Sequence, residues 1–98
     1  PTWTGTLAVT LAGLLEADVP SGIYHTTGRG ETTWYGFARE ALRLAGIDAD
    51  IVPVPTEAFP TPARRPRYSV LDCSSTEEVV GPLPDWREAL AKAMAEGL

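Results

Sequence analysis

Hydrophobic residues recur with the 3.6-residue period of an α-helix in three stretches of the chain. The first stretch begins near Thr4 and ends at the turn-forming sequence "DVPSG". Gly46 and Gly97 follow the second and third stretches, and a glycine just past the last turn is typical of a helix C-terminus. The apolar faces of the three predicted helices contain, in chain order, Leu7, Leu11, Leu14 and Leu15, then Trp34, Phe37, Ala38, Ala41, Leu42 and Ala45, and finally Trp86, Leu90, Ala93 and Met94.

Polar residues at the predicted helix starts are of the types that cap helix N-termini. A Ser, Thr or Asp three residues before a Glu can form a reciprocal capping box. This pattern begins the last helix, and it also predicts a short additional helix in "SSTEEVVG". The expected capping residues are Thr4 for the first helix, Thr32 or Thr33 for the second, Ser75 with Glu78 for the short helix, and Asp85 with Glu88 for the last.

Short segments rich in β-branched and aromatic residues lie between these helices. "GIYHTT" is predicted to be a strand, and "DIVPVP" a second short strand that Pro53 confines to a sheet edge, while "RYSVLD" is expected to be extended. The sequence therefore predicts an α/β fold with about three helices and two or three short strands. Because so few strands cannot make a doubly wound sheet, we expect residues 1–98 to form a single small lobe that packs on something larger.

Composition narrows the class of protein. Of the 98 residues, 44% are hydrophobic and 21% charged, which is ordinary for a globular domain, and burial of roughly 60 to 65% of the unfolded surface is expected at this length. No apolar run is long enough to cross a bilayer. With one cysteine, Cys73, and one histidine, His25, neither an intrachain disulfide nor a metal site is expected. This cysteine usage predicts a reducing, cytoplasmic location. The net charge of −5 argues against nucleic-acid binding.

Motifs for catalysis and cofactor binding are not found. "TGRGE" offers G-x-G without the remainder of a dinucleotide-binding fingerprint. The Tyr-x-x-x-Lys pair of short-chain dehydrogenases has no match, since Tyr35 is followed at that spacing by Arg39 and the only lysine is Lys92. His25 is expected to be structural. We therefore predict no catalytic, cofactor-binding or metal-binding residue in this chain.

The stretch "TPARRPRYSV" stands out in an acidic chain. Arg64, Arg65 and Arg67 fall within four residues, next to Pro62 and Pro66. A guanidinium presents a planar fork of donors that suits two phosphate oxygens at once, and nearby prolines reduce the entropy lost on binding. The stretch is therefore predicted to be either an anion-binding loop or a solvated loop whose arginines pair with the surplus carboxylates.

Three separated stretches resemble one known family, in its order and spacing. "GRGETTWYGFAREALRLAG", "FPTPARRPRYSVLD" and "LPDWREAL" are similar to the C-terminal part of dTDP-4-dehydrorhamnose reductases (RmlD-like), extended short-chain dehydrogenases that reduce a nucleotide-linked 4-keto sugar with NAD(P)H. "PTWTGTLA" resembles a further family segment, so the resemblance covers essentially the whole chain. It implies a substrate-binding lobe without the Rossmann domain, which in this family holds the cofactor and the catalytic pair.

The resemblance also suggests ligand contacts. Its "RRP" motif places the second arginine, here Arg65, on the diphosphate of the nucleotide sugar, with Arg64 and Arg67 as further candidates. "GETTW" matches the family's "GETSW" at residues 31–34, with Thr in place of Ser. Thr33 and Trp34 are therefore candidates for the substrate site, although a helix cap and a core aromatic are the simpler interpretation. Trp3 is a candidate for the nucleotide cleft, with packing as the alternative.

The parent protein is accordingly expected to be a dTDP-4-dehydrorhamnose reductase that binds NAD(P)H outside this chain. The chain begins at Pro1 without a methionine, and it is expected to be a fragment that is not catalytic alone. Two alternatives remain, namely the lobe of another nucleotide-sugar epimerase or dehydratase and a non-catalytic, reductase-like interaction module. The expected partners are a dTDP-sugar and the Rossmann domain. A homodimer is also considered, because an apolar face left without that domain would promote self-association.

Overall fold

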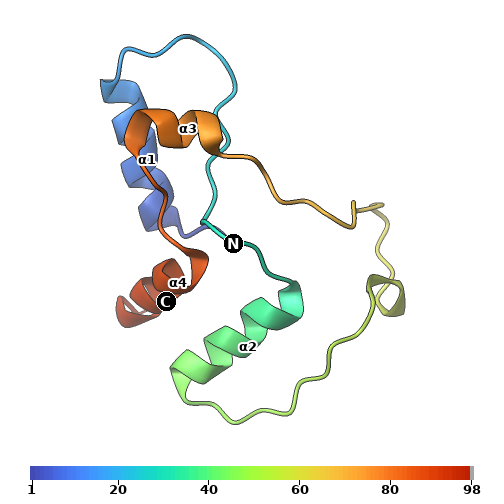
Figure 1. Ribbon diagram of the computed structural model, residues 1–98. Helices are drawn as coiled ribbons and strands as arrows, with labels where there is room; N and C mark the ends of the chain where they lie inside the picture. Colours follow the sequence, from blue (N-terminus) through green and yellow to red (C-terminus); the bar gives the residue numbers. More distant parts are fainter. Residues whose placement is uncertain (98) are drawn as a thin grey trace.

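The computed structural model describes residues 1–97. Four α-helices follow one another along this part of the chain: α1 (Thr4–Glu16), α2 (Trp34–Ala45), α3 (Ser74–Val80) and α4 (Trp86–Ala95). One turn of 3-10 helix, η1 (Thr56–Ala58), interrupts the connection between α2 and α3. α1 packs against α3, and α2 packs against α4 (Figure 1).

The expectation of two or three strands was wrong, because residues 1–97 contain none. The segment around residues 23–29 is extended, but no strand in the described residues pairs with it; loops and the first turns of helices lie beside it instead. Arg29 forms an isolated parallel bridge with Asp85, and its N–H donates to the carbonyl of Pro84 at 2.8 Å. The predicted second strand lies in the long connection after α2, with no extended segment beside it to complete a ladder. β-Propensity without a pairing partner leaves these segments as extended coil.

The centre of the small core is Trp86, at the first turn of α4. Trp86 is 1% exposed, and the other buried apolar residues lie in the same helix or just before it, namely Leu83, Ala89, Leu90 and Ala93. Phe37 brings α2 onto this centre, with its ring 6.2 Å from the Trp86 ring. Gly28 is buried beside Trp86, and a Cβ there would overlap the carbonyl oxygen of Pro1. The predicted apolar face of α4 is confirmed.

Helix ends follow the predicted capping in part. The hydroxyl of Thr33 accepts from the N–H of Gly36 at 3.0 Å, and Gly46 ends α2 with a φ of 69°, as predicted. Asp85 accepts from the N–H of Arg87 at 2.8 Å, which confirms Asp85 as the cap of α4, but the predicted reciprocal bond to Glu88 is not formed in the described residues. The other two predictions were wrong, since neither α1 nor α3 has a side-chain cap at its N-cap residue, Trp3 or Cys73.

The carboxylates near α3 have other roles than the predicted capping box. α3 begins at Ser74, whose N–H donates to the Asp72 carboxylate at 2.9 Å. This bond is the main reason why the pKa of Asp72 is lowered. The carboxylate of Glu77 accepts from the N–H of Leu83 at 2.9 Å and so ties the end of α3 to the turn before α4.

α1 is covered on one side by α3. Gly13 allows the close approach, since a Cβ there would lie 3.1 Å from Val80. Thr76 of α3 is fully buried, and its hydroxyl donates to the carbonyl of His25 at 2.6 Å. The leucine face of α1 is less covered than its period suggests, because Leu11 is 48% exposed and Leu15 is 86% exposed.

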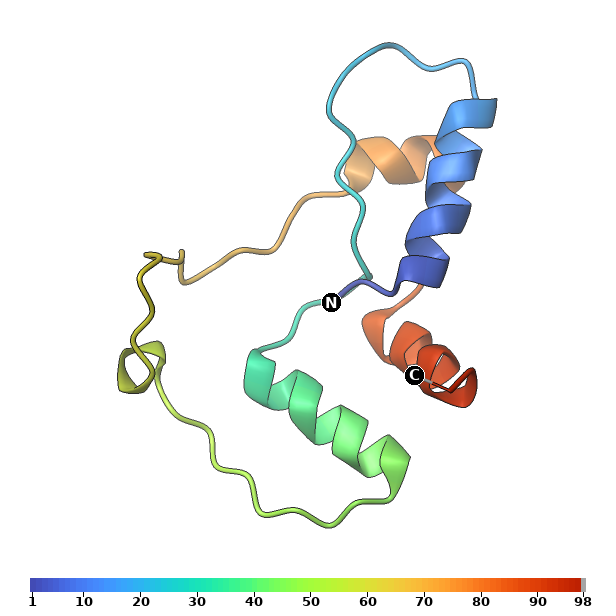
Figure 2. The same ribbon diagram turned by 180° about the vertical axis from the view of Figure 1, so that it is seen from behind.

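The long connection between α2 and α3 stands away from the helices. Figures 1 and 2 show it as a wide arc from the end of α2 to the start of α3. The radius of gyration is 15.8 Å, against about 13 Å for a compact domain of about 100 residues. The accessible surface of 7765 Å² likewise exceeds the roughly 5400 Å² of a compact protein of this mass, so less surface is buried than the sequence suggested.

Candidate functional site

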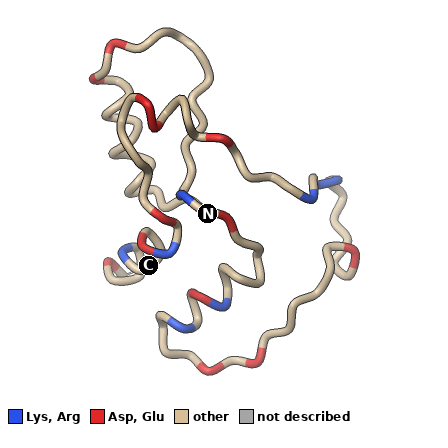
Figure 3. Tube along the Cα trace, in the orientation of Figure 1, with Lys and Arg blue, Asp and Glu red and all other residues tan. Residues whose placement is uncertain are grey.

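The stretch "TPARRPRYSV", residues 61–70, lies in the outer part of this arc and is called the arginine loop below. Every residue in it is exposed. Figure 3 shows basic residues gathered there, on the arc and away from the basic residues of the helices. The prediction of a non-helical loop is confirmed for these residues, and Pro62 and Pro66 restrict the backbone on either side of Arg64 and Arg65.

The three arginines of the loop are not equivalent. Arg67 lies 3.8 Å from the carboxylate of Glu57, and both side chains are largely exposed. Neither Arg64 nor Arg65 has an ion pair within the described part of the chain. Of the three arginines, only Arg67 pairs with a carboxylate in the described residues, as the solvated-loop interpretation expected of all three. The remaining two present unpaired guanidinium groups to solvent.

Tyr68 joins the arginine loop to the helical part of the molecule. Its hydroxyl donates to the carboxylate of Glu31 at 2.7 Å, across 37 residues of sequence. This hydrogen bond raises the pKa of Tyr68, since ionisation would remove the donor and place a second negative charge beside Glu31. The sequence analysis did not identify this contact, because nothing in one sequence pairs two exposed side chains so far apart.

Residues 27–31, called the facing segment below, lie opposite residues 70–73, and a hollow of about 240 Å³ separates them. Leu83 closes the hollow on the side of the core, and Thr27 meets Cys73 across it, with 3.3 Å between the hydroxyl oxygen and the sulfur. The hollow has both polar and apolar walls. Its lining includes Glu31, which binds Tyr68, and Val70, the last residue of the arginine loop.

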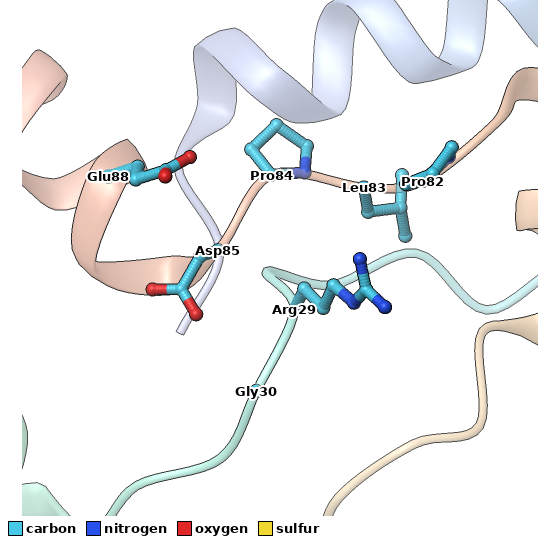
Figure 4. Close-up of a pocket in the computed structure, with 7 residues that line it drawn as sticks. All are labelled: Arg29, Gly30, Pro82, Leu83, Pro84, Asp85 and Glu88. Carbon is cyan, nitrogen blue, oxygen red and sulfur yellow. The ribbon is translucent and has the colours of Figure 1, made fainter.

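A second, larger hollow of about 610 Å³ lies on the other side of Arg29, and its lining includes Pro84, Asp85 and Glu88. Figure 4 shows the guanidinium of Arg29 extending away from the carboxylate of Asp85. Arg29 was not among the predicted site residues. In the sequence, the G-x-G pattern indicates only the backbone of a candidate dinucleotide-binding turn, and it assigns no role to the basic side chain between the two glycines.

The other predicted substrate-site residues lie at the starts of α1 and α2, outside the arginine loop. Thr33 is the cap of α2, as the simpler interpretation had it. Trp34 is 88% exposed, so the alternative role as a core aromatic was wrong; α4 covers Phe37 but not the first turn of α2. Trp3 is half-buried, with its ring packed over Gly5 at the start of α1. Of the predicted set, Trp34 is thus the aromatic ring that is free for contact.

The glycines of the facing segment do not fit a dinucleotide cofactor. A dinucleotide fingerprint needs glycine backbone open to a pyrophosphate at a strand-to-helix turn. Here Gly28 is buried against Pro1 and Trp86, and no strand precedes it in the described residues. Residues 1–97 also contain no group of three or more His, Cys, Asp or Glu placed to hold a metal ion, and none of their helices is long and apolar enough to cross a membrane.

This arrangement is that of a small, open, mostly helical domain that presents an arginine-rich loop. The family model described as RmlD substrate binding domain matches residues 1–98. The chain belongs to this family, as the resemblance of its three motifs indicated.

Curated relatives agree with the family match. The chain is 46% identical over 99 residues to a dTDP-4-dehydrorhamnose reductase of Streptomyces griseus, covering 95% of this chain and 33% of that protein. It is 39% identical over 107 residues to a dTDP-4-dehydrorhamnose reductase of Burkholderia thailandensis, covering 92% and 36%. A probable dTDP-4,6-dihydroxy-2-methyloxan-3-one 4-ketoreductase of Streptomyces antibioticus is 41% identical over 100 residues, covering 98% and 33%. The chain spans about a third of the length of these relatives.

Proposed function

We propose that residues 1–98 form the single substrate-binding lobe of a dTDP-4-dehydrorhamnose reductase, which reduces dTDP-4-dehydro-L-rhamnose to dTDP-L-rhamnose with NAD(P)H. The observation that carries the proposal is the match of the substrate-binding family model over the whole chain. In this proposal NAD(P)H supplies the hydride and is bound by a Rossmann domain outside this chain, and the poor fit of the glycines of the facing segment to a dinucleotide supports that placement. That the protein is located in the cytoplasm and that it forms a homodimer remain predictions.

Within this function, Arg65 binds the diphosphate of the nucleotide sugar. Three features of the loop support this role. Arg65 is exposed, it has no ion pair among residues 1–97, and Pro66 follows it directly in the sequence. A charged, bidentate donor suits two phosphate oxygens, and a restricted backbone loses less entropy when it binds. Arg64 adds positive potential, while Arg67 is partly neutralised by Glu57.

The nucleotide end of the ligand is supported more strongly than the sugar. The relatives from Streptomyces griseus and Streptomyces antibioticus are both named for dTDP-linked substrates, but for different keto sugars. A second candidate function is therefore the reduction of another dTDP-linked 4-keto sugar. Diphosphate binding by Arg65 serves both functions equally, because the contact is made to the part of the ligand that the two substrates share.

The test is Arg65→Ala in the complete protein that contains this chain, with dTDP-4-dehydro-L-rhamnose and NADPH as substrates. A hydrogen bond to a charged group is worth roughly 1.5 to 3 kcal/mol, so KM for the sugar nucleotide should rise roughly 10- to 100-fold. The value of kcat should change little, because the contact is made in the ground state and the transition state alike. Arg65→Lys should recover part of the loss by restoring the charge without the fork.

Arg39→Ala is the matched control, since it removes the same charge from an exposed position on α2. An unchanged KM in Arg65→Ala would remove this residue from the site. Absence of turnover in the wild-type protein with this substrate, but turnover with another dTDP-linked 4-keto sugar, would favour the second candidate function.

A further inference from the structure

The arginine loop needs a support if it is to hold Arg65 in place. Residues 48–71 contain one turn of 3-10 helix and are otherwise irregular, and most of them are exposed. An irregular connection of this length has a large conformational entropy, which a ligand would have to remove on binding. Prolines stiffen the loop locally, but they do not fix where it lies relative to the helices.

The Tyr68–Glu31 hydrogen bond supplies a fixed point. Among the described residues, the other hydrogen bond that joins residues 48–71 to the rest of the chain is local, from the Cys73 thiol to the carbonyl of Leu71 at 3.9 Å, two residues away in sequence. Tyr68 lies three residues after Arg65, with Pro66 between them. Because proline fixes φ and restricts the residue before it, an anchor at position 68 limits the positions open to residue 65.

Glu31 is itself held on both sides. Upstream, the N–H of Arg29 donates to Pro84 at 2.8 Å, and its carbonyl accepts from the N–H of Trp86 at 3.0 Å. Downstream, Thr33 is the cap that begins α2. The carboxylate of Glu31 therefore projects from a short segment that the core residue Trp86 and the start of a helix both position.

The pairing also leaves the arginines available. Glu31 accepts from a neutral phenol, and it forms no ion pair with an arginine of the loop. Arg64 and Arg65 thus keep no ion pair in the described part of the chain. A tie through a neutral donor anchors the loop without consuming the positive charge that the ligand requires.

From these contacts we infer that Tyr68 and Glu31 are positioning residues, whose hydrogen bond holds the arginine loop in the place where Arg65 meets the diphosphate of the nucleotide sugar. This inference rests on the proposed function. Neither residue contacts the reacting atoms in this scheme. Their effect is to lower the entropic cost of binding, and it should appear in KM and not in kcat.

The experiment uses Tyr68→Phe, Glu31→Ala and the double variant in the complete protein. Each single variant should raise KM for the dTDP-sugar about 3- to 10-fold, which corresponds to the modest net value of one solvent-exposed hydrogen bond. The double variant should be no worse than the more affected single variant, because both remove the same interaction. Glu31→Gln keeps a neutral acceptor and should lie nearer to wild type.

Tyr24→Phe is the matched control, because the hydroxyl of Tyr24 donates to the carbonyl of Pro20 within its own loop at 2.6 Å. This variant should leave KM unchanged. Urea unfolding should remain a single transition with a midpoint close to that of wild type in all variants, which separates positioning from a general loss of stability.

Limited trypsin digestion gives a readout that does not depend on activity. The bonds after Arg64 and Arg67 are exposed, and they should be cut faster in Tyr68→Phe and Glu31→Ala than in wild type or Tyr24→Phe. Wild-type KM and wild-type cleavage in both variants would overturn the inference. If the wild-type protein neither binds nor reduces any dTDP-sugar, the proposed function fails, and the digestion still decides whether the tie orders the loop.

Discussion

Replacing Trp86 by Ala is the most severe test of how this small core is built. Trp86 is 1% exposed, contacts Phe37 of α2, and lies 4.6 Å from the guanidinium carbon of Arg87, measured to the ring centre. A buried tryptophan removes roughly 200 Å² from water, which at about 25 cal/mol per Å² corresponds to about 5 kcal/mol. Measured Trp-to-Ala losses in protein cores are about 3 to 5 kcal/mol.

This loss is comparable with the whole stability expected for the domain. Proteins have about 0.05 to 0.15 kcal/mol of stability per residue, and a chain that buries this little surface should lie near the lower limit, at about 5 kcal/mol. Trp86→Ala should therefore be largely unfolded without denaturant. Trp86→Phe keeps an aromatic ring against Phe37 and removes a buried indole N–H that has no partner in the described residues. It should cost no more than about 2 kcal/mol.

The assay is urea unfolding followed by far-UV circular dichroism, with Trp34→Ala as the control. Trp34 is 88% exposed, so its removal should change the free energy of unfolding by less than about 0.5 kcal/mol. An unfolding midpoint for Trp86→Ala equal to that of Trp34→Ala would refute the assignment of Trp86 as the centre of the core.

Two further predictions concern the cap of α2 and the Tyr68–Glu31 hydrogen bond, called the tie here. Thr33→Ala should lower the free energy of unfolding by about 1 kcal/mol in the same urea assay, because it removes the acceptor for the N–H of Gly36. Thr33→Ser should be nearly neutral. An equal loss in both variants would contradict the role of Thr33 as the cap. Tyr68 should ionise above the ordinary tyrosine pKa of about 10, because the hydrogen bond to Glu31 favours the protonated phenol. The tie should accordingly be present below that pH and be lost as pH rises through the raised pKa, as followed by ultraviolet absorbance against Tyr68→Phe. The ionisation should return to the ordinary range in Glu31→Ala, and an unchanged titration there would exclude Glu31 as the cause.

The helices could be predicted from sequence because their signals are local. The period of Trp86, Leu90 and Ala93, the cap at Thr33 and the glycine at residue 46 each lie within a few residues of the structure that they specify. The strand predictions failed for the opposite reason. A strand needs a partner, and "GIYHTT" and "DIVPVP" have the composition of strands but no neighbour to complete a ladder within residues 1–97.

The candidate site divides in the same way. A cluster of arginines beside prolines is visible in one sequence, and so is the likeness of its motif to a family of sugar-nucleotide reductases. Which arginine is paired was decided by tertiary structure, since Glu57 comes within 3.8 Å of Arg67 through the fold of the loop. The exposure of Trp34 was decided there too, because a helical period indicates which residues share a face but not where the covering helix stops.

By itself, the sequence determined the helices, the arginine loop and the family, because each depends on residues close together in the chain or on motifs that can be compared directly. Tertiary structure alone decided that Trp86 is the centre of the core, that residues 23–29 are extended without forming a strand, and that Tyr68 bonds to Glu31. These features depend on contacts between residues far apart in sequence, and their free energies arise only when the chain has brought both partners together.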